Sequence, residues 1–147
     1  MRGSLVFAAS MSLWGAHALA ADTMKFSCDI AAVQVKNLRV PIGYKTTATV
    51  QIDPSSRKWT LVWFDGAGHP IGDEAGALVP ADDTVFTLKD QEDKTASGEG
   101  HTLQTIDRTS GAFVRDSRGK NAGVDVVLKQ VGTCKPAAWS FSLCPNV

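Results

Sequence analysis

The chain has 147 residues, 44% of them hydrophobic, and its 15 basic side chains balance its 15 acidic ones. This length predicts one domain with a core of its own. The zero net charge argues against a general binder of nucleic acids or anionic membranes. No stretch approaches the roughly 20 apolar residues of a membrane-spanning helix, so we expect a protein that does not span a membrane.

The first 20 residues have the organisation of a cleavable secretion signal. Arg2 supplies a positive start, residues 5–16 are mostly apolar, and small residues lead up to Ala20. This order of features is the one that a signal peptidase recognises. We therefore expect residues 1–20 to be removed and residues 21–147 to form a single exported domain in the bacterial periplasm or outside the cell.

Three cysteines, Cys28, Cys134 and Cys144, follow the signal. In an oxidising compartment an odd number predicts one bridge and one remaining thiol. In the chain-entropy model a Cys28–Cys134 bridge is worth roughly 4 to 5 kcal/mol, and a Cys134–Cys144 bridge roughly 3 kcal/mol. We favour Cys28–Cys134 slightly, because both residues cap strand-like segments. Cys144 would then stay free or form a disulfide between chains.

Short segments of alternating apolar and polar residues make up the rest of the chain, a period that is typical of β-strands. The predicted strands cover residues 24–30, extended through 33–35 and, on the other phase, 38–42, and then 47–53, 58–64, 84–89, 102–107, 112–116 and 124–134, with a short edge strand over 77–79. We expect a turn or bulge at Lys36–Asn37, an irregular region over 65–83 and an exposed polar loop over 90–100. This pattern predicts an all-β fold, a small antiparallel β-barrel or sandwich of about seven to eight short strands, and the meandering order favours the barrel.

One motif occurs twice. Residues 52–59 and 106–113 share the pattern Ile-Asp-x-(Ser/Thr)-Ser-x-x-aromatic at an offset of 54 residues. Each aspartate can accept hydrogen bonds from the backbone N–H groups just beyond it, which predicts two equivalent hairpins. Two related halves and one turn solution used twice both explain the match, and the second explanation is the simpler.

Two groups of side chains are candidates for binding. The aromatic residues of one predicted strand usually pack in a core, but in an open barrel they would line a ligand cavity; they are Trp59, Trp63 and Phe64. A basic group around the second hairpin is a candidate surface for an anionic partner, although such charges usually face solvent. Its members are Arg108, Arg115, Arg118 and Lys120.

Catalytic and metal motifs give weaker signals. His69, His101 and Asp65 could supply a metal site only if their loops converge, and they lack recognisable ligand spacing. Residues 90–93 carry three carboxylates but not the pattern of a calcium loop. The chain has no nucleophile elbow and no phosphate-binding glycine loop. We therefore expect no cofactor, no metal and no enzymatic activity.

The layout of the chain, with an early Phe-x-Cys strand, Ile-Asp turns and a closing Gly-Thr-Cys, resembles that of short exported proteins of Gram-negative bacteria. The resemblance is general and carries over no functional residue. The all-β pattern without a catalytic group favours a non-enzymatic binding module for a protein or a small apolar ligand. One alternative is a small metal-dependent hydrolase that uses His69, His101 and the loop from Asp65 to Glu74. Another is a structural component of the cell envelope, linked between chains through Cys144.

Overall fold

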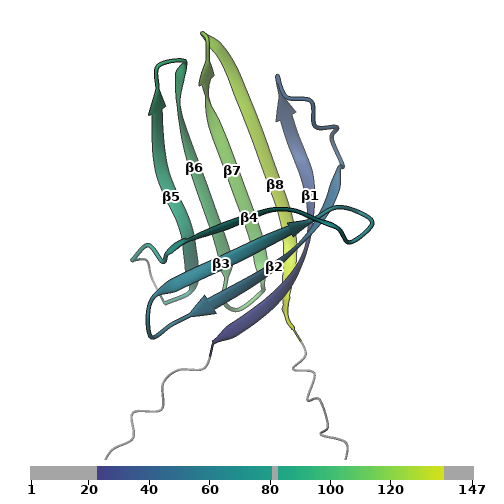
Figure 1. Cartoon of the computed structure of the whole chain (residues 1–147), viewed down its shortest axis with the longest axis vertical. Coiled ribbons are helices and arrows are strands. Elements are labelled where there is room, and N and C mark those ends of the chain that lie inside the picture. Colours follow the sequence, from purple (N-terminus) through teal and green to yellow (C-terminus); the bar gives the residue numbers. More distant parts are fainter. Residues whose placement is uncertain (1–22, 81–82, 138–147) are drawn as a thin grey trace, which may run out of the picture.

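The computed structural model describes residues 23–80 and 83–137, and it confirms the predicted all-β class. Eight antiparallel strands form one sheet that is curled into a half-barrel (Figure 1). The strands are β1 (Met24–Lys36), β2 (Lys45–Asp53), β3 (Lys58–Phe64), β4 (Pro70–Ala77), β5 (Val85–Thr95), β6 (Gly98–Asp107), β7 (Ala112–Asn121) and β8 (Val124–Pro136). The expected signal segment and Cys144 lie outside the described residues.

The sheet consists of two four-strand meanders. Its strand order is β4-β3-β2-β1-β8-β7-β6-β5, so the meanders meet where β1 pairs with β8, and β4 and β5 form the two edges. In the described part of the chain, a single backbone bridge between Val79 and Thr87 connects the two edges. No helix among these residues has the length and apolar character needed to cross a membrane.

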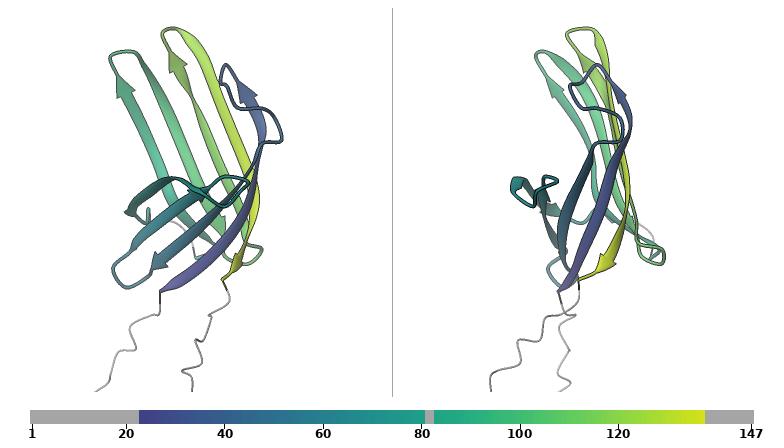
Figure 2. Two further views of the ribbon diagram at one scale, coloured as in Figure 1. Left: turned by 45° about the vertical axis from the view of Figure 1, so that its right-hand side comes forward. Right: turned by 90° about the vertical axis from the view of Figure 1, so that its right-hand side faces the viewer.

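The two meanders cover each other only in part. β2, β3 and β4 fold over the lower half of the longer strands β5–β8, as the turned views show (Figure 2). The upper half of these strands, next to the β5–β6 and β7–β8 turns, extends beyond them (Figure 1). The inner face of the sheet therefore has a covered part and an uncovered part.

The covered part of the inner face is the hydrophobic core. In β2 every second residue is buried from Thr46 to Ile52, as the sequence pattern predicts. Side chains from six strands meet in this core with 3% or less of their surface exposed, among them Ile30, Val50, Leu61, Leu88, Ile106 and Phe113. Full burial of one such side chain stabilises the fold by roughly 1.5–3 kcal/mol, so this part of the molecule supplies most of its stability.

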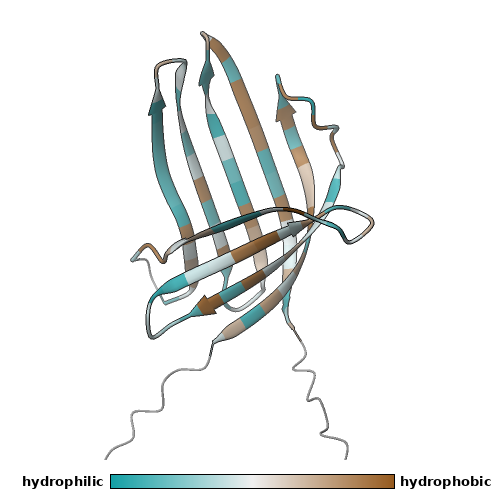
Figure 3. Cartoon of the chain, in the orientation of Figure 1, coloured by the Kyte–Doolittle hydropathy of each residue, from teal (hydrophilic) through white to brown (hydrophobic). Residues whose placement is uncertain are grey.

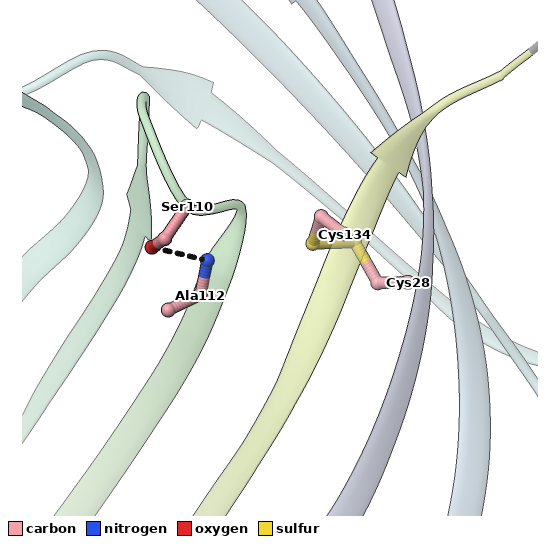
Figure 4. The surroundings of a disulfide bond; sticks show 4 residues. All are labelled: Cys28, Ser110, Ala112 and Cys134. Atoms are coloured by element: carbon pink, nitrogen blue, oxygen red, sulfur yellow. Dashed lines mark hydrogen bonds between the residues drawn. A yellow bond between two sulfur atoms is a disulfide. The ribbon is translucent and has the colours of Figure 1, made fainter.

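The favoured Cys28–Cys134 pairing is confirmed. The two cysteines are register partners on β1 and β8, and the bridge lies beside the β6–β7 turn (Figure 4). The turn is attached to the same strand, because the Cys134 N–H donates to the Gly111 carbonyl oxygen at 2.7 Å. An intramolecular disulfide of this kind is typical of proteins in an oxidising compartment.

Both predicted Ile-Asp turns form. Asp53 Oδ1 accepts from the backbone N–H of Ser55 at 3.0 Å, and Asp107 Oδ1 accepts from that of Thr109 at 2.9 Å. These turns close the β2–β3 and β6–β7 hairpins. An offset of 54 residues also brings the start of β3 and of β4 onto the start of β7 and of β8. The repeat therefore extends over three strands of each meander, further than the motif alone indicates.

Two predicted irregular segments are regular strands. The expected loop over residues 90–100 is wrong, because β5 continues to Thr95 and pairs with β6 in a hairpin whose charged residues face each other, such as Lys94 and Glu99. The middle of the expected irregular region over 65–83 is β4, a strand with two glycines and two acids that pairs with β3. The turn expected at Lys36–Asn37 is confirmed, since β1 ends at Lys36 and Asn37 has a positive φ, but the extended segment expected over 38–42 is part of the loop that leads to β2.

Candidate functional site

Polar residues form a continuous layer immediately above the hydrophobic core. Residues that are partners in an antiparallel sheet point to the same face. The pairs along this row are Ala32–Gln130, Gln130–Arg115, Arg115–Gln104 and Gln104–Lys89, which run from β1 to β5. We call Lys89, Gln104, Arg115 and Gln130 the polar layer. It separates the covered core from the uncovered part of the inner face.

The uncovered inner face above the polar layer is hollowed into a groove of about 350 Å³, which we call the inner groove. Its floor consists of small side chains from β6 and β7, and Val126 and Leu128 of β8 form an apolar wall. The upper part of β8 is correspondingly hydrophobic, whereas β5 on the other side is hydrophilic (Figure 3). The small floor residues are Gly100, Thr102, Ser117 and Gly119. Charged or titratable residues also line the groove; they are Asp93, Glu99, His101, Arg118 and Lys120.

Glu74 of β4 reaches across the open edge of the sheet to the polar layer. Its Oε1 lies 3.1 Å from Arg115 Nη2 and 3.7 Å from Lys89 Nζ. All three side chains are about four-fifths buried. Both cations contact the same carboxylate oxygen, and the buried Oε2 of Glu74 has no hydrogen-bond partner.

Gln104 is the most unusual residue of the layer. It is completely buried, yet neither its Oε1 nor its Nε2 has a hydrogen-bond partner. Arg115 Nε is also buried without a partner, and of the five such atoms among the described residues four belong to Gln104, Arg115 and Glu74. Leaving a buried polar group unpaired costs about 1–3 kcal/mol. The cost is therefore concentrated at one place, one register row below Thr102 and Ser117 of the groove floor.

The predicted aromatic residues are divided between two environments. Trp63 points inward, with its ring centroid 5.4 Å from Arg115 Cζ and 6.1 Å from the ring of Phe113. Trp59 is buried in the core, where its Nε1 donates to the Ala77 carbonyl oxygen at 3.3 Å. Phe64 follows Trp63 in β3 and lies on the opposite face. Trp63 alone of the three contacts the polar layer.

The predicted basic residues are distributed over three places. Arg115 belongs to the polar layer, whereas Arg118 and Lys120 lie on the outer face of β7. Arg108 lies in the β6–β7 turn, and its Cζ is 4.5 Å from the ring centroid of Phe86. The structure therefore does not bring the four cations together on one surface.

The outer face of β5–β8 is charged but largely self-paired. Lys94, Glu99, Lys120 and Asp125 are consecutive register partners across the four strands, so opposite charges alternate along the row. Arg118 Nε also donates to Asp116 Oδ1 at 2.7 Å. Alternating charge across strands stabilises a solvated sheet face and is a weak signal for a binding site.

The two histidines contact different carboxylates. His101 Nε2 lies 2.6 Å from Asp90 Oδ1 on the outer face, and His69 Nδ1 lies 3.4 Å from Asp65 Oδ2 in the β3–β4 loop. Asp65 also accepts from backbone N–H groups of its own loop, which lowers its pKa. Within residues 23–80 and 83–137, no group of three or more His, Cys, Asp or Glu side chains is placed to hold a metal ion.

Sequence reasoning missed Gln104 and Lys89. The alternation in β6 contained a signal for Gln104, because it shares its phase with the core residue Ile106. Glu74 was considered only as the end of a loop in the metal-dependent alternative, since its strand was not predicted. No protein-family model matches the chain, and a search of curated proteins finds no significant match. The chemistry of the inner face is therefore the basis for a functional assignment.

Proposed function

We propose that this chain is an exported, non-enzymatic binding module that holds a small ligand in the inner groove, with the polar end of the ligand on the polar layer. The observation that carries the proposal is the side chain of Gln104, which is fully buried and unpaired one register row below the floor of the groove, so that a ligand would reach it only by opening this row. A ligand that exchanges hydrogen bonds with this amide would recover the free energy that the empty arrangement loses.

The position of Gln104 argues for a binding role over a structural one. An apolar side chain of similar size would fill the same space without leaving a buried amide unpaired. The neighbouring row contains Ile106 and Phe113, so the sheet accommodates large apolar residues one step below. Rules of folding that hold elsewhere in a molecule are most often broken at functional sites.

The groove and its surroundings support a small polar ligand over the apolar ligand that the sequence suggested. A volume of about 350 Å³ is at the lower end of the range for small-molecule sites. The groove is bounded by hydroxyl groups and glycines as well as by the apolar wall of β8. Arg115 and Glu74 hold each other in place, which preorganises the charged groups beneath the groove floor.

Export is part of the same proposal. The signal-like first 20 residues and the Cys28–Cys134 bridge both support an oxidising location, the periplasm or the extracellular space. A binding module in that location needs no catalytic group, which agrees with the separate contacts of His69 and His101.

A thermal-shift screen tests the proposal. The oxidised protein is heated with a panel of sugars, sugar acids, amino acids, dicarboxylates and fatty acids, each at millimolar concentration. At a ligand concentration of about 100 Kd the fold gains about 2.7 kcal/mol, which shifts the Tm by several degrees. We expect hits among the polar compounds, and we expect Gln104→Met to abolish them.

The matched control is Gln51→Met, which changes an exposed glutamine on the outer face of β2. This variant should respond to the panel as the wild type does. A panel without any hit, or hits that survive Gln104→Met unchanged, would overturn the proposed site.

A further inference from the structure

We infer that the loop between β1 and β2, residues 37–44, docks the protein on the surface of a lipid bilayer. We call this segment the apolar loop. The inference goes beyond the proposed function, because it concerns a partner of another class. Its support comes from the exposed side chains of the loop, from the rigid turn at its tip and from its charge.

Exposed apolar side chains are concentrated at the apolar loop. Six large hydrophobic residues of the described chain are exposed, and three of them lie within seven consecutive positions: Leu38 at 40%, Ile42 at 72% and Tyr44 at 41%. A fourth, Val33, lies shortly before the end of β1. Exposed hydrophobic residues that are scattered singly need no explanation, but a cluster indicates an interaction site. The loop runs along the right-hand margin of the upper half of the molecule (Figure 1).

The tip of the apolar loop is a rigid turn. The Tyr44 N–H donates to the Pro41 carbonyl oxygen at 3.1 Å, and Gly43 has a φ of 82°. These features define a type II turn with Ile42 at its corner. Two backbone hydrogen bonds attach the turn to Ala32 of β1: the Gly43 N–H donates to its carbonyl oxygen at 2.7 Å, and its N–H donates to that of Tyr44 at 3.0 Å. The turn therefore presents Ile42 in a fixed position, and docking costs little ordering of the chain.

The apolar loop carries one cation and no acid. Arg39 is exposed and forms no ion pair in the part of the chain that the structure describes. The lysines on either side of the loop are closer to acids. Lys36 pairs with Asp125 at 3.5 Å. Lys45 lines a hollow of about 840 Å³ that it shares with two acids, which are Asp29 and Asp65. The charge available to an anionic headgroup is therefore that of Arg39.

The side chains of the loop fit a bilayer interface better than a protein partner. The aliphatic Ile42 lies at the corner of a turn and can enter the acyl boundary directly, whereas a protein partner would have to supply a matching pocket. Tyr44 combines an apolar ring with a polar hydroxyl, as is typical of residues at the level of the headgroups. Arg39 can extend its guanidinium to lipid phosphates while its stem stays in apolar surroundings. All three residues lie within six positions of the chain.

Flotation with lipid vesicles tests the inference. The form expected after export, which begins at Ala21, is mixed with vesicles of phosphatidylcholine alone or with added phosphatidylglycerol, and the floating fraction gives the partition coefficient. We expect binding to both kinds of vesicle and tighter binding to the anionic ones. Ile42→Ser should weaken partitioning about tenfold, because an aliphatic side chain no longer leaves water. Ile42→Leu should partition as the wild type does.

Matched variants outside the loop control for the loss of an apolar side chain or of a charge. Val124→Ser changes an aliphatic residue that is 50% exposed at the start of β8. Arg57→Gln removes an exposed arginine from the β2–β3 turn, at the other end of β2. Both variants should partition as the wild type does. Arg39→Gln should lose most of the preference for anionic vesicles, about fivefold for one charge near the membrane surface.

The outcomes separate this inference from the proposed function. Gln104→Met should bind vesicles as the wild type does, because Gln104 belongs to the polar layer and not to the loop. A wild type that does not float, or flotation that Ile42→Ser leaves unchanged, would overturn the inference without affecting the inner groove. An equal loss in Val124→Ser would also overturn it. Self-association that Ile42→Ser abolishes, without flotation, would overturn it in favour of a contact between two copies of the chain.

Discussion

Arg115 of β7 and Glu74 of β4 form an ion pair across the open side of the half-barrel, with Nη2 3.1 Å from Oε1. The two strands belong to different meanders. β4 is one edge of the sheet, and β7 is separated from the other edge by β6 and β5. The pair therefore connects the meanders at a place where backbone pairing between β4 and β5 is nearly absent. Because the pair is about four-fifths buried, removal of one partner would leave a largely desolvated charge without compensation.

Replacing Glu74 with glutamine should destabilise the protein. Loss of the carboxylate leaves Arg115 and Lys89 close together without a counter-charge, and we expect the free energy of unfolding to fall by about 1–2 kcal/mol. Urea denaturation measures the change. Asp116→Asn is the control, since its partner Arg118 is more than half exposed, and an equal loss in both variants would contradict the role of the Glu74 contact.

Replacing Gln104 with methionine should have the opposite effect on stability. Removal of a buried amide that has no partner is expected to raise the free energy of unfolding of the ligand-free protein by about 1–2 kcal/mol. The exposed Gln51→Met control should change it by less than about 0.5 kcal/mol. A ligand-free Gln104→Met protein that is less stable than the wild type would show that the amide contributes to folding itself.

Removing the disulfide should cost more than either of these changes. The bridge closes a loop with a sequence separation of 106 residues, for which the chain-entropy model gives about 4–5 kcal/mol. The Cys28→Ala/Cys134→Ala double variant should therefore be strongly destabilised in chemical denaturation. Wild-type protein in reductant should lose a similar amount, while the double variant should not respond to reductant. A double variant as stable as the oxidised wild type would contradict this account of the bridge.

Asp53 should make the stability depend on pH in the acid range. Hydrogen bonds from the hydroxyls and backbone N–H groups of Ser55 and Ser56 lower the pKa of Asp53 from 3.8 to about 2. A carboxyl group with a lowered pKa stabilises the fold above its unfolded pKa, and this contribution is lost as the pH falls toward the folded pKa. Wild-type stability should thus fall more steeply than that of Asp53→Asn between about pH 5 and pH 2.

Denaturation of both proteins at a series of pH values measures the difference. Ser55→Ala and Ser56→Ala remove donors to the same carboxylate, so each should raise the pKa of Asp53 toward its ordinary value. Parallel pH curves for the wild type and Asp53→Asn would show that the turn does not hold the charged form preferentially.

The regular part of the fold was readable from the sequence because local chemistry and tertiary contacts agree there. The alternation of β2 and β8 and the Ile-Asp motif are local signals. They predict two strands and two turns, and all four form. β4 was missed because Gly72 and Gly76 disfavour a strand, and pairing with β3 overrides that preference. The charged end of β5 resembles a loop, yet charged residues are common on the edge strand of a sheet.

The site was largely hidden for a related reason. Gln104 and Arg115 are 11 positions apart and become neighbours only through the register of β6 and β7. Glu74 belongs to the other meander and is too far from both residues in the sequence for a local pattern to reveal the contact. Among the sequence candidates, Arg115 and Trp63 do reach the site, one as a basic residue near a turn and the other as an aromatic on an alternating strand.

The most direct test is the side-chain amide of Gln104 in a nuclear magnetic resonance titration. The probe is the compound of the thermal-shift panel with the largest effect. The proposed site predicts that the Gln104 Nε2 protons and the Arg115 Nε proton shift with one common saturation curve, while the side-chain amide of Gln51 does not move. Shifts confined to the outer face around Arg118, or a saturated complex in which the Gln104 amide is unchanged, would contradict it.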